Sequence, residues 1–149
     1  MHRDTFTNLY LIYSEVDDDK LLEAWDELIG MTDSDSDPHY RMKRELFLEL
    51  DGLDLFINCM DKFSDNETLV QHMVICVSNI AESESLWPKL LKRDFVLQIA
   101  KFADSNEFTD GNWCGLDILA MLISDGPKSW QKTKVQFFYK LDWFTCLGF

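Results

Sequence analysis

Ser85-Leu86-Trp87 corresponds to Lys128-Ser129-Trp130, 43 residues later in this 149-residue chain, with the tryptophan in common. An upstream stretch, Asp54-Leu55-Phe56-Ile57, has a counterpart 40 residues later in Asp94-Phe95-Val96-Leu97. Matching residues also precede the two tryptophans: Ile80 with Ile123, and acidic Glu82 with acidic Asp125. The chain therefore contains an internal repeat with a period near 40 residues.

The repeat is carried by helical patterns, because no segment alternates apolar and polar residues convincingly with a period of two. A helical period of about 40–47 residues is typical of HEAT and armadillo arrays. Such arrays stack helices into a superhelix and usually bind other proteins. The sequence therefore predicts an all-α fold, an armadillo/HEAT-like right-handed α-solenoid of about three repeats.

Apolar spacing and helix-start signals divide the chain into elements. The predicted helices cover residues 5–16, 18–31, 40–50, 53–63, 69–82, 87–93, 95–103 and 113–123. Gly52 is expected to end the helix 40–50 in a left-handed conformation. The helix 69–82 is almost continuously apolar, so it should be buried on most sides. The predicted core comprises Leu69, Met73, Cys76, Val77, Ile80, Leu116, Leu119 and Leu122.

The domain organisation follows from these elements. Residues 1–130 are predicted to form one armadillo-like helical repeat domain. Residues 131–149 form an aromatic-rich C-terminal tail or an incomplete repeat. Two interpretations of the tail stay open: a helix that folds back onto the layer 113–123, or a dimer or partner surface.

Charge and composition exclude several classes of partner. The formal net charge is −13 and the pI is about 4.4, which disfavours nucleic acid and anionic lipid as partners. No apolar run approaches the roughly 20 residues of a membrane helix, and no secretory signal is visible. We expect a cytoplasmic or nuclear protein. Its cysteines should be buried and reduced: Cys59, Cys76, Cys114 and Cys146.

No motif indicates catalysis, a cofactor or a metal. Gly-x-Ser-x-Gly, His-Glu-x-x-His and Gly-rich phosphate loops are absent from the sequence. Asp33, Asp35 and Asp37 resemble the start of an EF-hand calcium loop, which requires Gly at its sixth position and Glu at its twelfth. Pro38 and Arg44 stand at those positions. The sequence therefore predicts a protein that is not an enzyme and binds no cofactor.

Asn79 and Glu82 form the most informative polar pair. They lie three residues apart near the end of the helix 69–82, so they emerge on one face. An amide and a carboxylate together could bind a peptide backbone and a protonated amine. In the alternative interpretation, Asn79 holds a loop in place and Glu82 is simply solvated.

Four motifs in this order and spacing suggest a family. They are Gly52-Leu53-Asp54-Leu55-Phe56, Ser78-Asn79-Ile80-Ala81-Glu82, Leu86-Trp87-Pro88-Lys89-Leu90 and Ser124-Asp125-Gly126-Pro127-Lys128-Ser129-Trp130. Together they resemble the C-terminal armadillo-like region of the zyg-eleven homologue family, over about residues 20–130. The members of that family are substrate receptors of cullin-2 RING ubiquitin ligases, in the ubiquitin-conjugation pathway. They recognise N-degrons, which are exposed amino-terminal glycines or other small residues.

The resemblance implies a peptide-binding site. In the family, the residues that match Asn79 and Glu82 lie in the pocket that binds the free amino terminus. An upstream pocket segment, Trp-Asn-Leu-Thr-Asp in the family, corresponds here to residues 29–33, so Asp33 is kept while Ile29 and Gly30 replace the Trp and Asn. Two more family positions, a Gly and a His, are changed here to Asp117 and Met121. The resemblance is therefore to a divergent member.

The leading functional hypothesis is a protein-binding module that recognises a protein or peptide with a free N-terminus. The sequence lacks the Leu-x-x-Leu-x-Leu repeats and the cullin-box segment of the family, so it resembles a truncated receptor module. Contact with a cullin-2 ligase is implied by the resemblance alone. The alternative is a non-enzymatic scaffold or oligomerisation domain without a peptide pocket.

Overall fold

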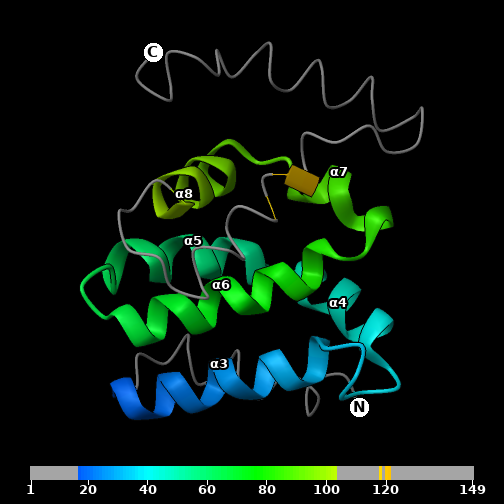
Figure 1. Cartoon of the computed structure of the whole chain (residues 1–149), viewed down its shortest axis with the longest axis horizontal. Coiled ribbons are helices and arrows are strands. Elements are labelled where there is room, and N and C mark those ends of the chain that lie inside the picture. Colours follow the sequence, from blue (N-terminus) through cyan, green and yellow to red (C-terminus); the bar gives the residue numbers. More distant parts are fainter. Residues whose placement is uncertain (1–16, 104–117, 119, 122–149) are drawn as a thin grey trace.

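The computed structural model describes residues 17–103, 118, 120 and 121, and every regular element in this part of the chain is a helix (Figure 1). The α-helices are α3 (Asp18–Thr32), α4 (Tyr40–Glu49), α5 (Gly52–Lys62), α6 (Glu67–Ala81), α7 (Trp87–Leu90) and α8 (Arg93–Ala103). A 3-10 turn, η1 (Glu84–Leu86), precedes α7. The all-α prediction is confirmed, and six of the predicted helices are found within a few residues of their expected bounds.

Side-chain caps fix the starts of the two longest helices. Asp17 accepts a hydrogen bond from the backbone N–H of Lys20 at 3.0 Å, at the start of α3. Asn66 accepts one from the N–H of Leu69 at 3.2 Å, at the start of α6. Such caps satisfy backbone donors that have no partner within the helix.

The connection between α4 and α5 differs from the prediction. Asp51, not Gly52, adopts the left-handed conformation, with φ 61° and ψ 29°. Gly52 is instead the first residue of α5, where a Cβ atom would lie 2.6 Å from the carbonyl oxygen of Phe47. The glycine is therefore required by close packing, and the turn falls to an aspartate, a residue type that tolerates this conformation comparatively well.

The helices pack in successive layers. Helix α3 lies along α6, and α5 contacts α6 on one side and α8 on the other (Figure 1). The five described members of the predicted core are at most 1% exposed: Leu69, Met73, Cys76, Val77 and Ile80. Ile118 is buried in the same cluster. This stacking is compatible with the predicted solenoid.

Trp87, in the motif Leu86-Trp87-Pro88-Lys89-Leu90, stabilises the C-terminal end of α6. Its side chain is 6% exposed, and its indole N–H donates to the carbonyl oxygen of Ala81 at 2.7 Å. That carbonyl is one of the last in α6 and has no partner within the helix. The tryptophan thus ends α6 and anchors the turn to α7, where Pro88 is in its favoured first-turn position.

Several predictions lie outside the described residues. They concern the helix 5–16, most of the helix 113–123, the tail 131–149, and Cys114, Cys146, Leu116, Asp117, Leu119, Leu122 and Trp130. Ile118, Ala120 and Met121 are helical, as predicted for 113–123.

Candidate functional site

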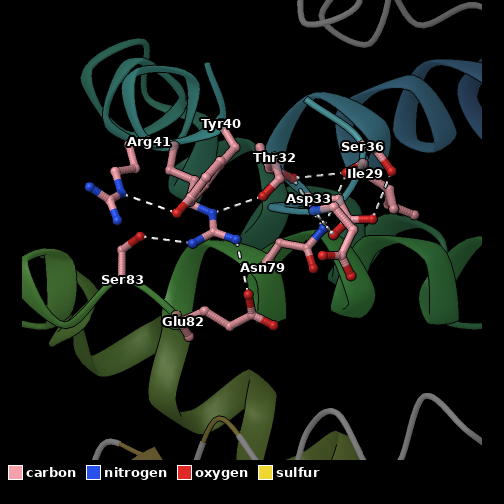
Figure 2. Close-up of polar contacts among 12 residues, drawn as sticks. Ile29, Thr32, Asp33, Ser36, Tyr40, Arg41, Asn79, Glu82 and Ser83 are labelled. Atoms are coloured by element: carbon pink, nitrogen blue, oxygen red, sulfur yellow. Dashed lines mark hydrogen bonds and ion pairs between the residues drawn. The ribbon is translucent and has the colours of Figure 1, made fainter. Parts of the chain in front are cut away.

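Asn79 joins the end of α6 to the end of α3. Its Nδ2 donates to the carbonyl oxygen of Ile29 at 3.2 Å and to Oγ1 of Thr32 at 3.3 Å (Figure 2). Thr32 is completely buried and donates in turn to the carbonyl oxygen of Leu28 at 2.7 Å. The amide nitrogen of Asn79 is therefore committed to α3, and its Oδ1 remains as an acceptor.

Asp33 follows Thr32 directly and caps the loop after α3. One carboxylate oxygen accepts from the backbone N–H of Asp35 at 3.1 Å, and the other accepts from the Ser36 hydroxyl at 2.9 Å. The hydrogen bond from Asp35, then that from Ser36, and the positive charge of Arg44 hold the pKa of Asp33 below its ordinary value of 3.8. Asp33 is therefore ionised at neutral pH.

Glu82 is paired rather than simply solvated. Its Oε2 lies 3.0 Å from Nη2 of Arg44, in a charge-assisted hydrogen bond. The two partners differ in exposure: the side chain of Arg44 is 3% exposed and that of Glu82 is 49% exposed. The arginine is the fixed partner, and Glu82 keeps Oε1 available toward solvent.

Arg44 connects three segments of the chain. Its Nε donates to the carbonyl oxygen of Thr32 at 2.8 Å, and its Nη1 donates to Oγ of Ser83 at 2.9 Å (Figure 2). Its guanidinium also lies 4.6 Å from the centre of the Tyr40 ring, at cation–π distance. A buried charge needs such partners to offset its loss of hydration.

A cleft of about 350 Å³ lies beside this network. It is lined by Tyr40, Arg41, Arg44, Glu45 and the segment 82–86. Glu82 therefore borders the cleft, whereas Asn79 and Asp33 do not line it. The structure brings all three predicted residues to the region where the end of α6 meets the end of α3 (Figure 2).

The sequence analysis missed the role of Arg44. It also missed Tyr40 and Ser83, which hold the arginine in place. A signal was present, since Arg44 shares the helical spacing of Tyr40 and buried Phe47, so it falls on the face that turns inward. A charged residue on the buried face of a helix indicates that it has a hydrogen-bond or ion-pair partner, but the sequence pattern does not show which residue that partner is.

The remaining features to consider are the cysteines, potential metal ligands and membrane-spanning helices. Cys59 and Cys76 are buried free thiols, as predicted, and burial raises their pKa to about 11 and about 12. No group of three or more potential metal ligands occurs in the part of the chain that the structure describes. The helices in this part are all too short or too polar to cross a bilayer.

Comparison of the sequence with known proteins identifies the family of this chain. Residues 10–139 match the sequence model of the family described as "Protein zer-1 homolog-like, C-terminal domain". The chain belongs to this family. The zer-1 match covers all seven described helical elements and confirms the family predicted from the four motifs.

Individual zer-1 relatives agree with the family match. The chain is 32% identical to "Zyg eleven-related protein 1" of Caenorhabditis elegans over 123 residues, which are 82% of this chain and 13% of that protein. It is 30% identical to "Protein zer-1 homolog" of Homo sapiens over 118 residues, 75% of this chain and 14% of that protein. The chain thus spans about one seventh of the length of these relatives.

Proposed function

We propose that this chain is the substrate-recognition part of a ubiquitin ligase receptor and that it binds proteins through a free amino terminus. The membership in the zer-1 family supports the receptor role. Asp33, Asn79 and Glu82 are the proposed ligand-binding residues, and the chain performs no catalysis itself. A cullin-2 ligase complex is the proposed assembly in which such a receptor acts.

One observation carries this proposal: the region where α6 meets α3 offers acceptors to a cation. Asp33 is ionised, Glu82 has an exposed carboxylate oxygen, and Oδ1 of Asn79 has no partner among the residues that the structure describes. A protonated amino terminus has three N–H donors and one positive charge. Charge-assisted hydrogen bonds from an ammonium to carboxylates are among the strongest that proteins form.

The nitrogen of Asn79 has a supporting role in this scheme. Because Nδ2 is held by Ile29 and Thr32, it holds the end of α3 and hence the position of Asp33. Asn79 would therefore contact the ligand through Oδ1 alone.

The experiment that tests the function compares two peptides. One begins with a free glycine, and the other is the same peptide with an acetylated amino terminus. Acetylation removes the positive charge and two donors, so only the free peptide should bind in a calorimetric titration. The variant Glu82→Gln should weaken its binding by about 1.5–3 kcal/mol, the contribution of a hydrogen bond to a charged group.

The alternative function, a scaffold or oligomerisation domain, gives a different result. Such a domain would bind both peptides equally or bind neither. Equal affinity for the two peptides, measured on folded protein, would reject the amino-terminus site.

The divergent segment offers a second test. Ile29 and Gly30 replace the Trp and Asn that the family has in its pocket, and a Cβ atom added at Gly30 would meet no atom within 4 Å. The double variant Ile29→Trp/Gly30→Asn should bind the free-glycine peptide more tightly, provided that circular dichroism shows it folded, since Ile29 is partly buried against the core. Lack of any gain, with helicity retained in circular dichroism, would mean that this segment does not border the ligand.

A further inference from the structure

Several hydroxyl residues share a sequence pattern that acidophilic protein kinases recognise, with an acidic residue at the first and at the third position after the acceptor. These acceptors are Ser14, Thr32, Ser34 and Ser64. The reason for the pattern is charge, because the carboxylates pair with cationic side chains beside the active site of such a kinase. Ser14 lies outside the described residues, and the structure distinguishes the other three.

Accessibility and local structure separate the three described acceptors. Thr32 is completely buried in the last turn of α3, and its hydroxyl donates to the helix backbone. Ser64 is exposed, but the acidic residue at its third position is Glu67, the first residue of α6. A serine and a helical residue cannot be presented together in the extended conformation in which a kinase binds its substrate. Among the described residues, these criteria leave Ser34.

Ser34 lies in the connection 33–39 between α3 and α4, and its side chain is exposed. Both of its acidic partners, Asp35 and Asp37, belong to the same non-helical connection. Asp35 is exposed, whereas Asp37 pairs with Lys43 at 2.5 Å, so the segment must release this contact when it enters a kinase. Exposed connections open locally at a low free-energy cost, which makes Ser34 a suitable acceptor.

We propose that Ser34 is phosphorylated by an acidophilic protein kinase and that the added phosphate tightens the binding of a cationic ligand at the proposed site. The first half of this inference goes beyond the proposed function, and the second half rests on it. In the reaction, the serine Oγ forms a bond to the γ-phosphorus of Mg-ATP while the bond from that phosphorus to ADP breaks. The hydroxyl proton passes to the catalytic base of the kinase.

The phosphate would be attached directly beside Asp33, one of the proposed ligand-binding residues. Asp33 is held by the backbone N–H of Asp35 and by the hydroxyl of Ser36 (Figure 2). A phosphoserine carries about −1.5 to −2 charges at pH 7. Phosphorylation of Ser34 therefore places additional negative charge at the edge of the site.

The charges already present do not cancel this addition. The acidic residues of the connection, the adjoining cleft and the end of α6 are Asp33, Asp35, Asp37, Glu45, Glu82 and Glu84. The basic residues of the same region are His39, Arg41, Lys43 and Arg44. Lys43 is engaged by Asp37 and Arg44 by Glu82, so neither cation is free to neutralise a new phosphate. An arriving ammonium group would thus meet a more negative field.

The first experiment locates the phosphate on the full chain. The variant Ser14→Ala, which lacks the acceptor outside the described residues, is incubated with Mg-ATP and casein kinase II, a kinase that prefers acidic residues after the serine. Peptide mass spectrometry should find Ser34 labelled first, Ser64 labelled more slowly and Thr32 unlabelled. Absence of phosphate on Ser34, or labelling of Thr32 or Ser64 at the same rate, would overturn the proposal.

Two matched variants test the role of the acidic context. Asp35→Asn removes the carboxylate directly after Ser34 and should slow the labelling of Ser34 while the circular dichroism spectrum stays unchanged, because Asp35 is exposed. Asp65→Asn is the control, since it removes the equivalent exposed carboxylate after Ser64 and should leave the labelling of Ser34 unchanged. Equal rates at Ser34 in the two variants would contradict recognition through the acidic residues.

The second experiment measures affinity by titration of the free-glycine peptide. Phosphorylation of Ser34 should tighten binding by about two- to five-fold, the size of an interaction between exposed charges. The gain should shrink at high salt, because mobile ions screen exposed charges. The variant Ser34→Ala, treated with the kinase in the same way, should show no gain.

The outcomes separate this inference from the proposed function. If Ser34 is phosphorylated and the affinity is unchanged or weaker, the regulatory role is overturned and the modification site stands. If the unmodified protein does not distinguish the free from the acetylated peptide, the proposed function and the regulatory role fail together. Mass spectrometry still decides the modification site in that case, because it does not depend on any ligand.

Discussion

The side-chain amide of Asn79 donates to the backbone carbonyl oxygen of Ile29, a residue 50 positions earlier in the chain, at 3.2 Å. This contact adds a second side-chain donor to a carbonyl in the last turn of α3, which also accepts from Oγ1 of Thr32 at 3.3 Å. It connects the two helices that carry the candidate site. Asn79 therefore has a structural role in addition to the ligand-binding role that we propose for it.

Asn79→Ala should destabilise the protein by about 1–2 kcal/mol, because the Ile29 carbonyl loses one of its two side-chain donors and Oγ1 of Thr32 loses the hydrogen bond that joins α3 to α6. Ser78→Ala is the matched control, since Ser78 is a half-buried neighbour on α6 and should change stability by no more than about 0.5 kcal/mol. Urea unfolding followed by circular dichroism measures both. Equal effects of the two substitutions would contradict the capping role of Asn79.

The two helical glycines should respond oppositely to alanine. Gly52→Ala places a Cβ atom 2.6 Å from the carbonyl oxygen of Phe47, so it should cost about 1–3 kcal/mol, as overpacking does. Gly30→Ala meets nothing within 4 Å and should stabilise α3 by about 0.5–1 kcal/mol. Thermal unfolding of both variants checks the prediction, and a neutral Gly52→Ala would show that the helices can separate there.

Arg44 should matter more for stability than the exposed arginine beside it on α4. Arg44→Met leaves the carbonyl of completely buried Thr32 without this donor, at a cost of about 1–3 kcal/mol. Arg41 is exposed and donates only to the hydroxyl of Tyr40 among the hydrogen bonds of the described residues, so Arg41→Met should cost no more than about 0.5 kcal/mol. Chemical denaturation of the pair gives the comparison, and similar midpoints would argue against a buried arginine.

The two described cysteines should resist alkylation in the folded protein. Burial raises the pKa of Cys76 to about 12 and that of Cys59 to about 11, so the reactive thiolate is scarce at pH 8. Iodoacetamide labelling followed by peptide mass spectrometry should find both thiols unmodified in buffer and modified in urea. Rapid labelling of Cys76 without denaturant would show that α6 opens locally.

Binding of a free-glycine peptide should be lost as the pH rises above about 8, because a free amino terminus has a pKa of about 7.7–8.0 and becomes neutral there. Below neutrality binding should persist to about pH 5, since the pKa of Asp33 is lowered from 3.8 by its hydrogen bonds to Asp35 and Ser36. The lowered pKa of Asp33 also stabilises the fold. This stabilisation is fully present above the pKa that Asp33 has in the unfolded state, and it is lost as the pH falls through the pKa that Asp33 has in the folded state. Titrations at pH 5, 7 and 9 test the profile, and undiminished binding at pH 9 would exclude an ammonium ligand.

Local features determined what could be predicted from the sequence. Apolar spacing located the helices, because this effect depends on residues within a few positions. The continuous apolar run of α6 also identified five core residues that proved buried. The resemblance of four motifs led to the family, and the pocket segments of the family led to Asp33, Asn79 and Glu82 as the proposed site residues.

Contacts between distant segments were decided only by the tertiary structure. Arg44 and Glu82 are 38 residues apart, and no local pattern specifies that α4 and the end of α6 bring them within 3.0 Å. The same holds for Gly52, whose role depends on how closely α4 approaches α5 rather than on turn chemistry. Helix formation is governed by neighbours along the chain, whereas the pairing of buried charges depends on which helix faces meet once the core is packed.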